Sequence, residues 1–173
     1  RGAPIAALLW PAHAARVETH ELVTDEPDRD CRWLKIKVGA DDLPSVLARL
    51  ERLRQLAHSE ARLRLDVGGS WSLDEAIHAL APLGRLGVTL LEQPLRVGAI
   101  GQLAELRAQA AGHGIAIAVD EAVRDAADLA AHLDASAIDA VVLKPMFLGG
   151  LVAARELARV ALACDCRVIV TSA

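Results

Sequence analysis

A short strand-like run followed by a longer helix-like run recurs along most of this chain. Five successive strand-like runs have a charged residue at or next to their carboxyl end, and these residues are Lys37, Asp66, Glu92, Asp120 and Lys144. They lie 24 to 29 residues apart, which is the length of one strand–helix unit. Strands that alternate with helices predict a parallel sheet covered by helices. The near-constant step predicts a (β/α)8 TIM-type barrel, in which equivalent strand ends meet at one rim where active sites are built.

The first of these charged strands alternates three apolar side chains with Lys35 and Lys37. One face would be apolar, and the other would carry two ammonium groups. Strands of a helix-covered parallel sheet are normally buried on both faces, where an ammonium group needs a negative partner or a ligand. A solvated edge strand would also tolerate two lysines, but the acidic residues at the following strand ends favour buried negative charge nearby.

The expected elements follow one another without a linker or low-complexity segment. The expected strands span 17–23, 33–39, 63–66, 87–92, 115–120, 140–144 and 167–171. The expected helices begin at 42, 72, 100, 125 and 150 and end near 56, 83, 111, 133 and 163. Asp42 and Ser72 are expected N-caps, and Glu75 would complete a capping box with Ser72.

The chain begins without a methionine and stops directly after a strand-like run, so we expect it to be an excised piece. Residues 1–14 would be the remnant of a capping-domain helix and a linker, and residues 15–173 a partial barrel of about seven strands. Closure would then fail between the first and last strands, and their exposed edges would favour aggregation or association and an inactive fragment.

Composition excludes several classes of function. The net charge of −4 argues against a nucleic-acid or acidic-membrane surface. No run of eighteen apolar residues and no signal segment is present, which favours a soluble, cytoplasmic protein. Cys31, Cys164 and Cys166 are an odd count, and the Cys164–Cys166 pair lacks the second pair of a typical metal site. We therefore expect reduced structural thiols.

Asp66, Glu92 and Asp120 would come from adjacent strands, and three such carboxylates suit a hard divalent cation, most simply Mg²⁺. Any one of them alone could instead be a helix N-cap. Lys37 and Lys144 each lie two strands from the central Glu92, so the cation would have an ammonium group on each side. One lysine could then act as a base, while the metal holds a substrate carboxylate and stabilises the enediolate formed by proton loss.

This arrangement resembles the enolase superfamily, in its muconate-lactonizing-like branch, from about Arg1 to the last residue. Several local phrases are similar to those of the o-succinylbenzoate synthases of menaquinone biosynthesis. These are residues 63–66, Ser70-Trp71-Ser72, Glu92-Gln93-Pro94, residues 114–121, and residues 142–145 with Gly149-Gly150.

The resemblance implies a Mg²⁺-dependent carbon–oxygen lyase that performs a syn dehydration of a small-molecule carboxylate. By this resemblance Lys37 is the proton-abstracting base, Lys144 faces it and stabilises the enediolate, and Lys35 assists through the substrate carboxylate. The metal ligands would be Asp66, Glu92 and Asp120.

The chain departs from the family pattern at two positions: Gly68 replaces a usual Asn, and Ala122 replaces a common Ser. The capping domain that closes over the substrate and the eighth strand are also expected to be missing. N-acylamino acid racemases, dipeptide epimerases and muconate cycloisomerases share the same catalytic groups and remain alternatives. A catalytically silent fragment is a third alternative, which Gly68 and the missing domain favour.

Five other residues have less specific expectations. Arg64 shares strand parity with Asp66 and should point inward as an ion-pair partner. His20 could point into the pocket, although a surface or satisfied histidine is favoured, and Glu121 should be supporting or solvated. Gly149-Gly150 could receive a substrate anion at a helix N-terminus or form a plain tight turn.

Overall fold

The computed structural model of the protein describes residues 18–23, 26–28, 30–39 and 41–171. Within these residues seven strands form a single sheet, and they are β1 (Glu21–Leu22), β2 (Trp33–Lys37), β3 (Arg62–Asp66), β4 (Val88–Glu92), β5 (Ala116–Val119), β6 (Ala140–Leu143) and β7 (Arg167–Val170). The described helices are α2 (Leu43–Leu56), α3 (Leu73–Arg85), α4 (Ile100–Ala110), the short 3₁₀ helix η1 (Ala111–His113), α5 (Ala126–Asp134) and α6 (Leu151–Ala163). The expected remnant 1–14 lies outside the described residues.

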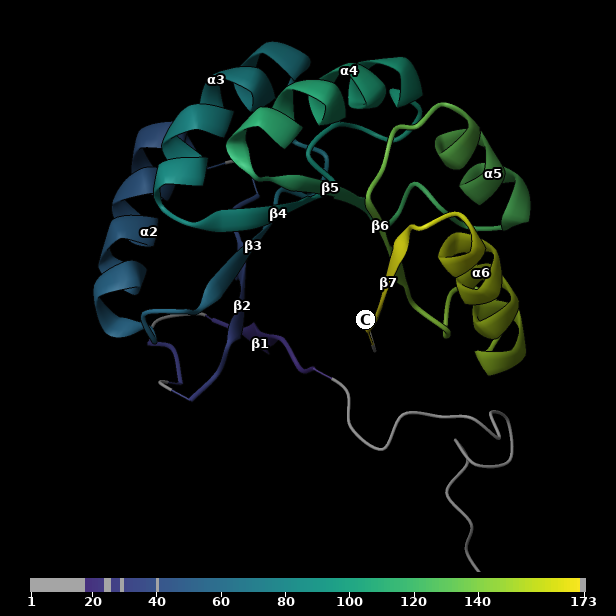
Figure 1. The fold of residues 1–173 in the computed structure, drawn as a ribbon, viewed down its shortest axis with the longest axis horizontal. Helices are drawn as coiled ribbons and strands as arrows, with labels where there is room; N and C mark the ends of the chain where they lie inside the picture. Colours follow the sequence, from purple (N-terminus) through teal and green to yellow (C-terminus); the bar gives the residue numbers. More distant parts are fainter. Residues whose placement is uncertain (1–17, 24–25, 29, 40, 172–173) are drawn as a thin grey trace, which may run out of the picture.

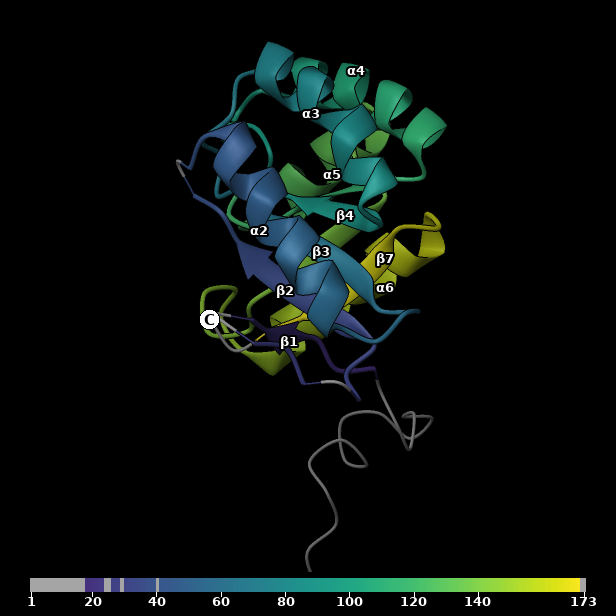
Figure 2. The same cartoon turned by 90° about the vertical axis from the view of Figure 1, so that its left-hand side faces the viewer.

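The strands stand in the sheet in the same order as in the sequence, and all neighbouring pairs are parallel. The sheet curves into an open half-barrel with the helices on its outer side (Figure 1). The view from the side shows α2 and α3 on the outside of the strands, with α3 over β4 (Figure 2). The prediction of an incomplete (β/α)8 TIM-type barrel is therefore confirmed.

The two faces of the sheet carry different side chains because successive residues of a strand point to opposite faces. The outward face packs with the buried stripes of the helices into the larger core, which includes Leu34 and Leu63 from the strands and Leu50 from α2. The inward face carries a smaller apolar cluster of Leu90, Ala118, Ala140 and Val142. Polar and charged residues of the site share the inward face with this smaller cluster.

Helix starts follow the local sequence. Asp42 caps α2 by accepting a hydrogen bond from Ser45 N–H, and Ser72 and Glu75 form the expected capping box at α3. Asp125 caps α5 in the same manner. None of the described helices is long and apolar enough to cross a membrane.

Strand boundaries differ from expectation at both ends of the charged series. The first strand is only Glu21–Leu22, shorter than the expected 17–23, of which Val17 lies outside the described residues. Its imperfect alternation explains the short pairing, since only two of its residues align with β2. Strands β5 and β6 end one residue before Asp120 and Lys144, so both side chains emerge just beyond the sheet.

Candidate active site at the carboxyl ends of the strands

The strand register brings the first charged positions to one level of the sheet. Lys37 pairs with Asp66, and Asp66 pairs with Glu92. Lys35 lies two residues earlier on the same inward face of β2, and its ammonium reaches toward the carboxyl ends of the next two strands. Its Nζ lies 2.8 Å from Asp66 Oδ2 and 3.0 Å from Glu92 Oε2. Lys35 therefore bridges two of the three carboxylates predicted to bind metal.

Glu92 is buried completely, and a second cation lies against it. Arg64 Nε donates to Glu92 Oε2 at 2.7 Å, and the Arg64 side chain is only 3% exposed. Arg64 Nη1 lies 3.2 Å from His20 Nδ1, whereas Nη2 is buried and has no partner among the described residues. The expectation that Arg64 is an inward-pointing ion-pair partner is confirmed.

His20 is held between Arg64 and an aromatic ring. Its imidazole stacks on Trp33 with ring centroids 4.7 Å apart. Burial lowers the pKa of His20, and the neighbouring Arg64 charge lowers it further. A neutral imidazole is favoured as a result, which allows Nδ1 to accept a hydrogen bond from the guanidinium. His20 is therefore a satisfied histidine beneath the site.

A second ion pair closes the other side of the site. Lys144 Nζ lies 2.5 Å from Asp120 Oδ2 and 3.5 Å from Glu121 Oε1, and the Glu121 side chain is largely exposed. Burial raises the pKa of Asp120, an effect that the hydrogen bond from Lys144 opposes and the charges of Glu121 and Glu92 strengthen. Burial lowers the pKa of Lys144, but the hydrogen bond and charge of Asp120 outweigh it, so the pKa of Lys144 lies above its usual value.

These two shifts have opposite effects on the pair, because a raised pKa favours the neutral acid at Asp120 and the cation at Lys144. The close contact decides in favour of the ionised pair, since a charge-assisted hydrogen bond stabilises both charged forms. Lys144 is therefore an ammonium group at neutral pH. Lys37, in contrast, is exposed at the rim, and the structure shows no ion pair for it within the described residues.

The donor set suits a hard cation, although the carboxylates do not converge fully. Among the described residues, no three acidic, histidine or cysteine side chains come close enough to coordinate one ion. The Lys35 ammonium nevertheless sits between Asp66 and Glu92, which shows that this pair of carboxylates accepts a cation. The negative charge of Glu92 also acts on Asp120. Oxygen donors from three adjacent strands are of the type that Mg²⁺ prefers.

The backbone at Gly68 supports Asp66 in a way that the sequence did not predict. Gly68 N–H donates to Asp66 Oδ1 at 3.2 Å. Its φ of +62° is a conformation that glycine adopts without strain. Glycine at the position of the usual Asn therefore still supplies one hydrogen bond to the first carboxylate.

A cavity of about 500 Å³ opens beside the Asp120–Lys144 pair. Its other walls include Val142 of β6 and the loop residues Phe147 and Leu148. Phe147 is 71% exposed and the adjacent Met146 is 75% exposed. Sequence reasoning missed this apolar wall, which an exposed Met-Phe pair directly after Lys144-Pro145 could have indicated. Charged groups thus lie beside an apolar surface, a combination that is common in small-molecule sites.

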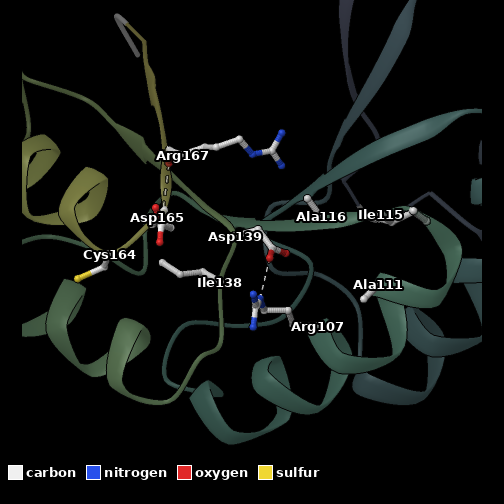
Figure 3. A pocket seen from close by; sticks show the side chains of 11 residues that line it. Arg107, Ala111, Ile115, Ala116, Ile138, Asp139, Cys164, Asp165 and Arg167 are labelled. Atoms are coloured by element: carbon white, nitrogen blue, oxygen red, sulfur yellow. Dashed lines mark hydrogen bonds and ion pairs between the residues drawn. The ribbon is translucent and has the colours of Figure 1, made fainter.

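Another cavity, of about 440 Å³, lies at the opposite, amino ends of β5 to β7 (Figure 3). Arg107 and Asp139 point toward each other there, with Nε and Oδ1 2.8 Å apart. Asp139 also accepts from Ile117 N–H, so it ties α4 to β5. Burial raises the pKa of Cys166 beside this cavity to about 11, which keeps it a thiol. Residues at the amino ends of barrel strands usually contribute to stability and not to catalysis, so we assign this cavity no catalytic role.

Comparison with protein families agrees with this geometry. Residues 14–173 match the family model described as Enolase C-terminal domain-like. The o-succinylbenzoate synthase of Thermobifida fusca (strain YX) is 37% identical over 146 residues, which cover 83% of this chain and 43% of that protein. The L-Ala-D/L-Glu epimerase of Bacillus subtilis (strain 168) is 32% identical over 141 residues, which cover 80% of this chain and 38% of the epimerase.

A solved racemase from Streptomyces coelicolor A3(2) with bound magnesium has the same fold, with a TM-score of 0.75 at 23% identity. The alignment covers 82% of this chain and 39% of the racemase. The chain thus spans less than half the length of these relatives.

Proposed function

The chain belongs to the enolase C-terminal domain-like family, and from this premise we propose that it carries the catalytic groups of a Mg²⁺-dependent lyase resembling o-succinylbenzoate synthase. The reaction would be a syn dehydration of a small-molecule carboxylate. The specific activity is favoured by the similarity to the o-succinylbenzoate synthase of Thermobifida fusca, at 37% identity.

One observation carries the proposal most directly. Lysines of β2 and of the loop after β6 flank three carboxylates from the strands between them, and the whole series faces one rim. Charged groups at or just beyond five successive strand ends support chemistry on an anionic substrate rather than a structural network alone. The Streptomyces coelicolor racemase of the same fold also contains bound magnesium.

Asp66, Glu92 and Asp120 would hold Mg²⁺, which when bound would withdraw charge from the substrate carboxylate and so acidify its α-carbon. Arg64 contacts Glu92 at 2.7 Å, and Lys35, which lies between Asp66 and Glu92, contacts it at 3.0 Å, so both cations help to orient the Glu92 carboxylate. Lys35 also lies close enough to the rim to contact the same substrate carboxylate. Lys35 would then help to orient the substrate and balance its negative charge.

Lys37 and Lys144 would divide the proton chemistry. Lys37 is exposed at the rim, where its amine can take the α-proton from one face of the substrate. Because syn dehydration removes both groups from that face, the protonated Lys37 can return the proton to the departing hydroxyl, which leaves as water. Lys144 is held as an ammonium by Asp120 and would stabilise the negative charge that develops on the opposite side.

A dipeptide epimerase is the alternative that a particular comparison favours. The L-Ala-D/L-Glu epimerase of Bacillus subtilis is 32% identical. In an epimerase the two lysines would act on opposite faces of the α-carbon, each serving as base for one enantiomer. Fold and catalytic groups are shared between these activities, so substrate turnover decides between them.

The proposed partner is a small-molecule carboxylate, with no nucleic acid or membrane involved. The apolar wall at Phe147 beside the Lys144 ammonium suits such a ligand. Cys31, Cys164 and Cys166 are all free thiols, in keeping with the cytoplasmic location that we propose.

Turnover of two substrates with Mg²⁺ would test the function. In the complete protein, we expect dehydration of the hydroxy-acid precursor of o-succinylbenzoate, and we expect Lys37→Ala and Lys144→Ala each to abolish it without loss of fold. Arg159→Ala, which removes an exposed cation of α6, is the control and should leave turnover unchanged.

If the protein is an epimerase, it will instead epimerise an Ala-Glu dipeptide, and each lysine variant will lose proton exchange with one enantiomer only. Near-normal dehydration by either lysine variant would contradict the assigned roles.

A further inference from the structure

Gln93 directly follows Glu92 and has an unusual backbone. Its φ is +42°, a left-handed conformation that residues other than glycine rarely adopt. The residue is only 2% exposed, so its amide is buried. Such strain persists where the surrounding structure fixes it, and it is often found near functional sites.

The side-chain amide of Gln93 makes three hydrogen bonds, two of which reach the neighbouring strand end. Its Oε1 accepts from Asp120 N–H at 3.0 Å and from Ala122 N–H at 3.3 Å. Its Nε2 donates to the Leu95 carbonyl at 2.8 Å. One side chain therefore links the segment after β4 to both sides of the turn that carries Asp120.

The backbone of Gln93 extends this link to a third strand. Its N–H donates to the Ala118 carbonyl of β5 at 2.8 Å, and its carbonyl accepts from Gly69 N–H at 2.6 Å. Gly69 follows the turn after Asp66. Gln93 thus connects the carboxyl ends of β3, β4 and β5, which are the three strands that present carboxylates.

We propose that Gln93 is a positioning residue that fixes Asp120 relative to Glu92 and thereby sets the affinity of the rim for Mg²⁺; this inference rests on the proposed function. Asp120 is 5% exposed, and its carboxylate direction depends on the backbone to which it is attached. The Gln93 Oε1 contact holds that backbone at the Asp120 amide itself. Groups of this kind, which orient metal ligands without touching the metal, typically affect metal affinity 10- to 100-fold.

The substitution Gln93→Met removes the side-chain hydrogen bonds of Gln93 while largely retaining its packing. Methionine has a similar length and volume but accepts nothing useful from Asp120 N–H or Ala122 N–H. We expect the Mg²⁺ dissociation constant, measured by titration calorimetry, to rise about 10- to 100-fold. We also expect faster hydrogen exchange at these two amides and, in the complete protein, recovery of turnover at saturating Mg²⁺.

Thr89→Val is the matched control on β4. Its hydroxyl is buried without a partner among the described residues, so its removal breaks no described hydrogen bond. Both Mg²⁺ affinity and exchange at Asp120 and Ala122 should stay within about twofold of wild type. A second variant, Gln93→Asn, keeps a residue that tolerates positive φ but shortens the side chain by one methylene. It should weaken Mg²⁺ binding and deprotect the same amides even if Gln93→Met does not fold.

The outcomes distinguish this inference from the proposed function. Unchanged exchange at Asp120 and Ala122 in the folded Gln93 variants, or Mg²⁺ affinity within twofold of wild type, would overturn the positioning role. A wild-type protein that binds no Mg²⁺ would overturn the proposed function and the affinity part of the inference. In that case the exchange experiment would still decide whether Gln93 holds the Asp120 backbone.

Discussion

Replacement of Arg64 by methionine is the most direct test of the charge network below the rim. Arg64 contacts Glu92 at 2.7 Å, and the two side chains are 3% and 0% exposed. Methionine retains most of the apolar stem but removes the guanidinium. A fully buried carboxylate then loses one of its two cationic partners, while His20 loses the donor at its Nδ1.

The size of the effect follows from what remains around Glu92. Loss of one partner of a buried ion pair typically destabilises a protein by about 3–5 kcal/mol. Lys35 Nζ still lies 3.0 and 3.2 Å from the two oxygens of Glu92, so the Lys35 ammonium still balances the buried negative charge. Removal of Arg64 also removes the buried Nη2, which has no partner among the described residues. We therefore expect a loss of about 3 kcal/mol, the lower end of that range.

Urea unfolding followed by tryptophan fluorescence would measure this loss. Arg124→Met is the control, since Arg124 and Asp128 form an ion pair at the surface and should contribute less than about 1 kcal/mol. Combining Arg64→Met with Glu92→Gln should restore part of the stability, because the uncompensated charge is removed. A loss for Arg64→Met no larger than that for Arg124→Met would refute the buried network.

Two further predictions concern a helix start and a sheet edge. Ser72→Ala should lower the free energy of unfolding by about 1 kcal/mol, because the N-cap of α3 is lost. Hydrogen bonds from Ser72 hold the pKa of Glu75 below its usual value, so wild-type stability should fall as pH drops through that pKa. The urea midpoint should therefore fall less between neutral and acidic pH in Ser72→Ala than in the wild-type protein. An equal fall in the two proteins would contradict the proposed cap. Val170→Lys should reduce association of the 173-residue chain in light scattering, since Val170 is 65% exposed on the terminal strand β7; unchanged scattering would argue against edge pairing.

The sequence predicted the fold well because strand–helix alternation is a local signal repeated many times. Asp42 and Ser72 marked helix starts through side chains that act within one turn, and both caps are present. The first strand was predicted less well. Its pairing depends on the register with β2, which its own residues specify weakly.

The sequence indicated which residues lie at neighbouring strand ends, but it did not indicate which side chains contact one another. Strand spacing places Asp66, Glu92 and Asp120 at neighbouring strand ends. It does not reveal that Lys35 bridges the first two carboxylates or that Lys144 pairs with the third. The partner of a long, flexible side chain depends on which groups the fold brings near it, and strand spacing does not specify these groups. The same holds for the buried amide of Gln93.

Loss of the substrate α-proton in D2O tests the central claim, that Lys37 removes this proton at a Mg²⁺ site formed by the strand ends. With the complete protein, the α-proton signal of the o-succinylbenzoate precursor, followed by proton NMR, should disappear only when Mg²⁺ is present. Lys37→Ala should slow that loss about 10²- to 10⁴-fold, the usual contribution of general acid–base catalysis. Loss of the signal at the wild-type rate in Lys37→Ala, or without Mg²⁺, would contradict the account.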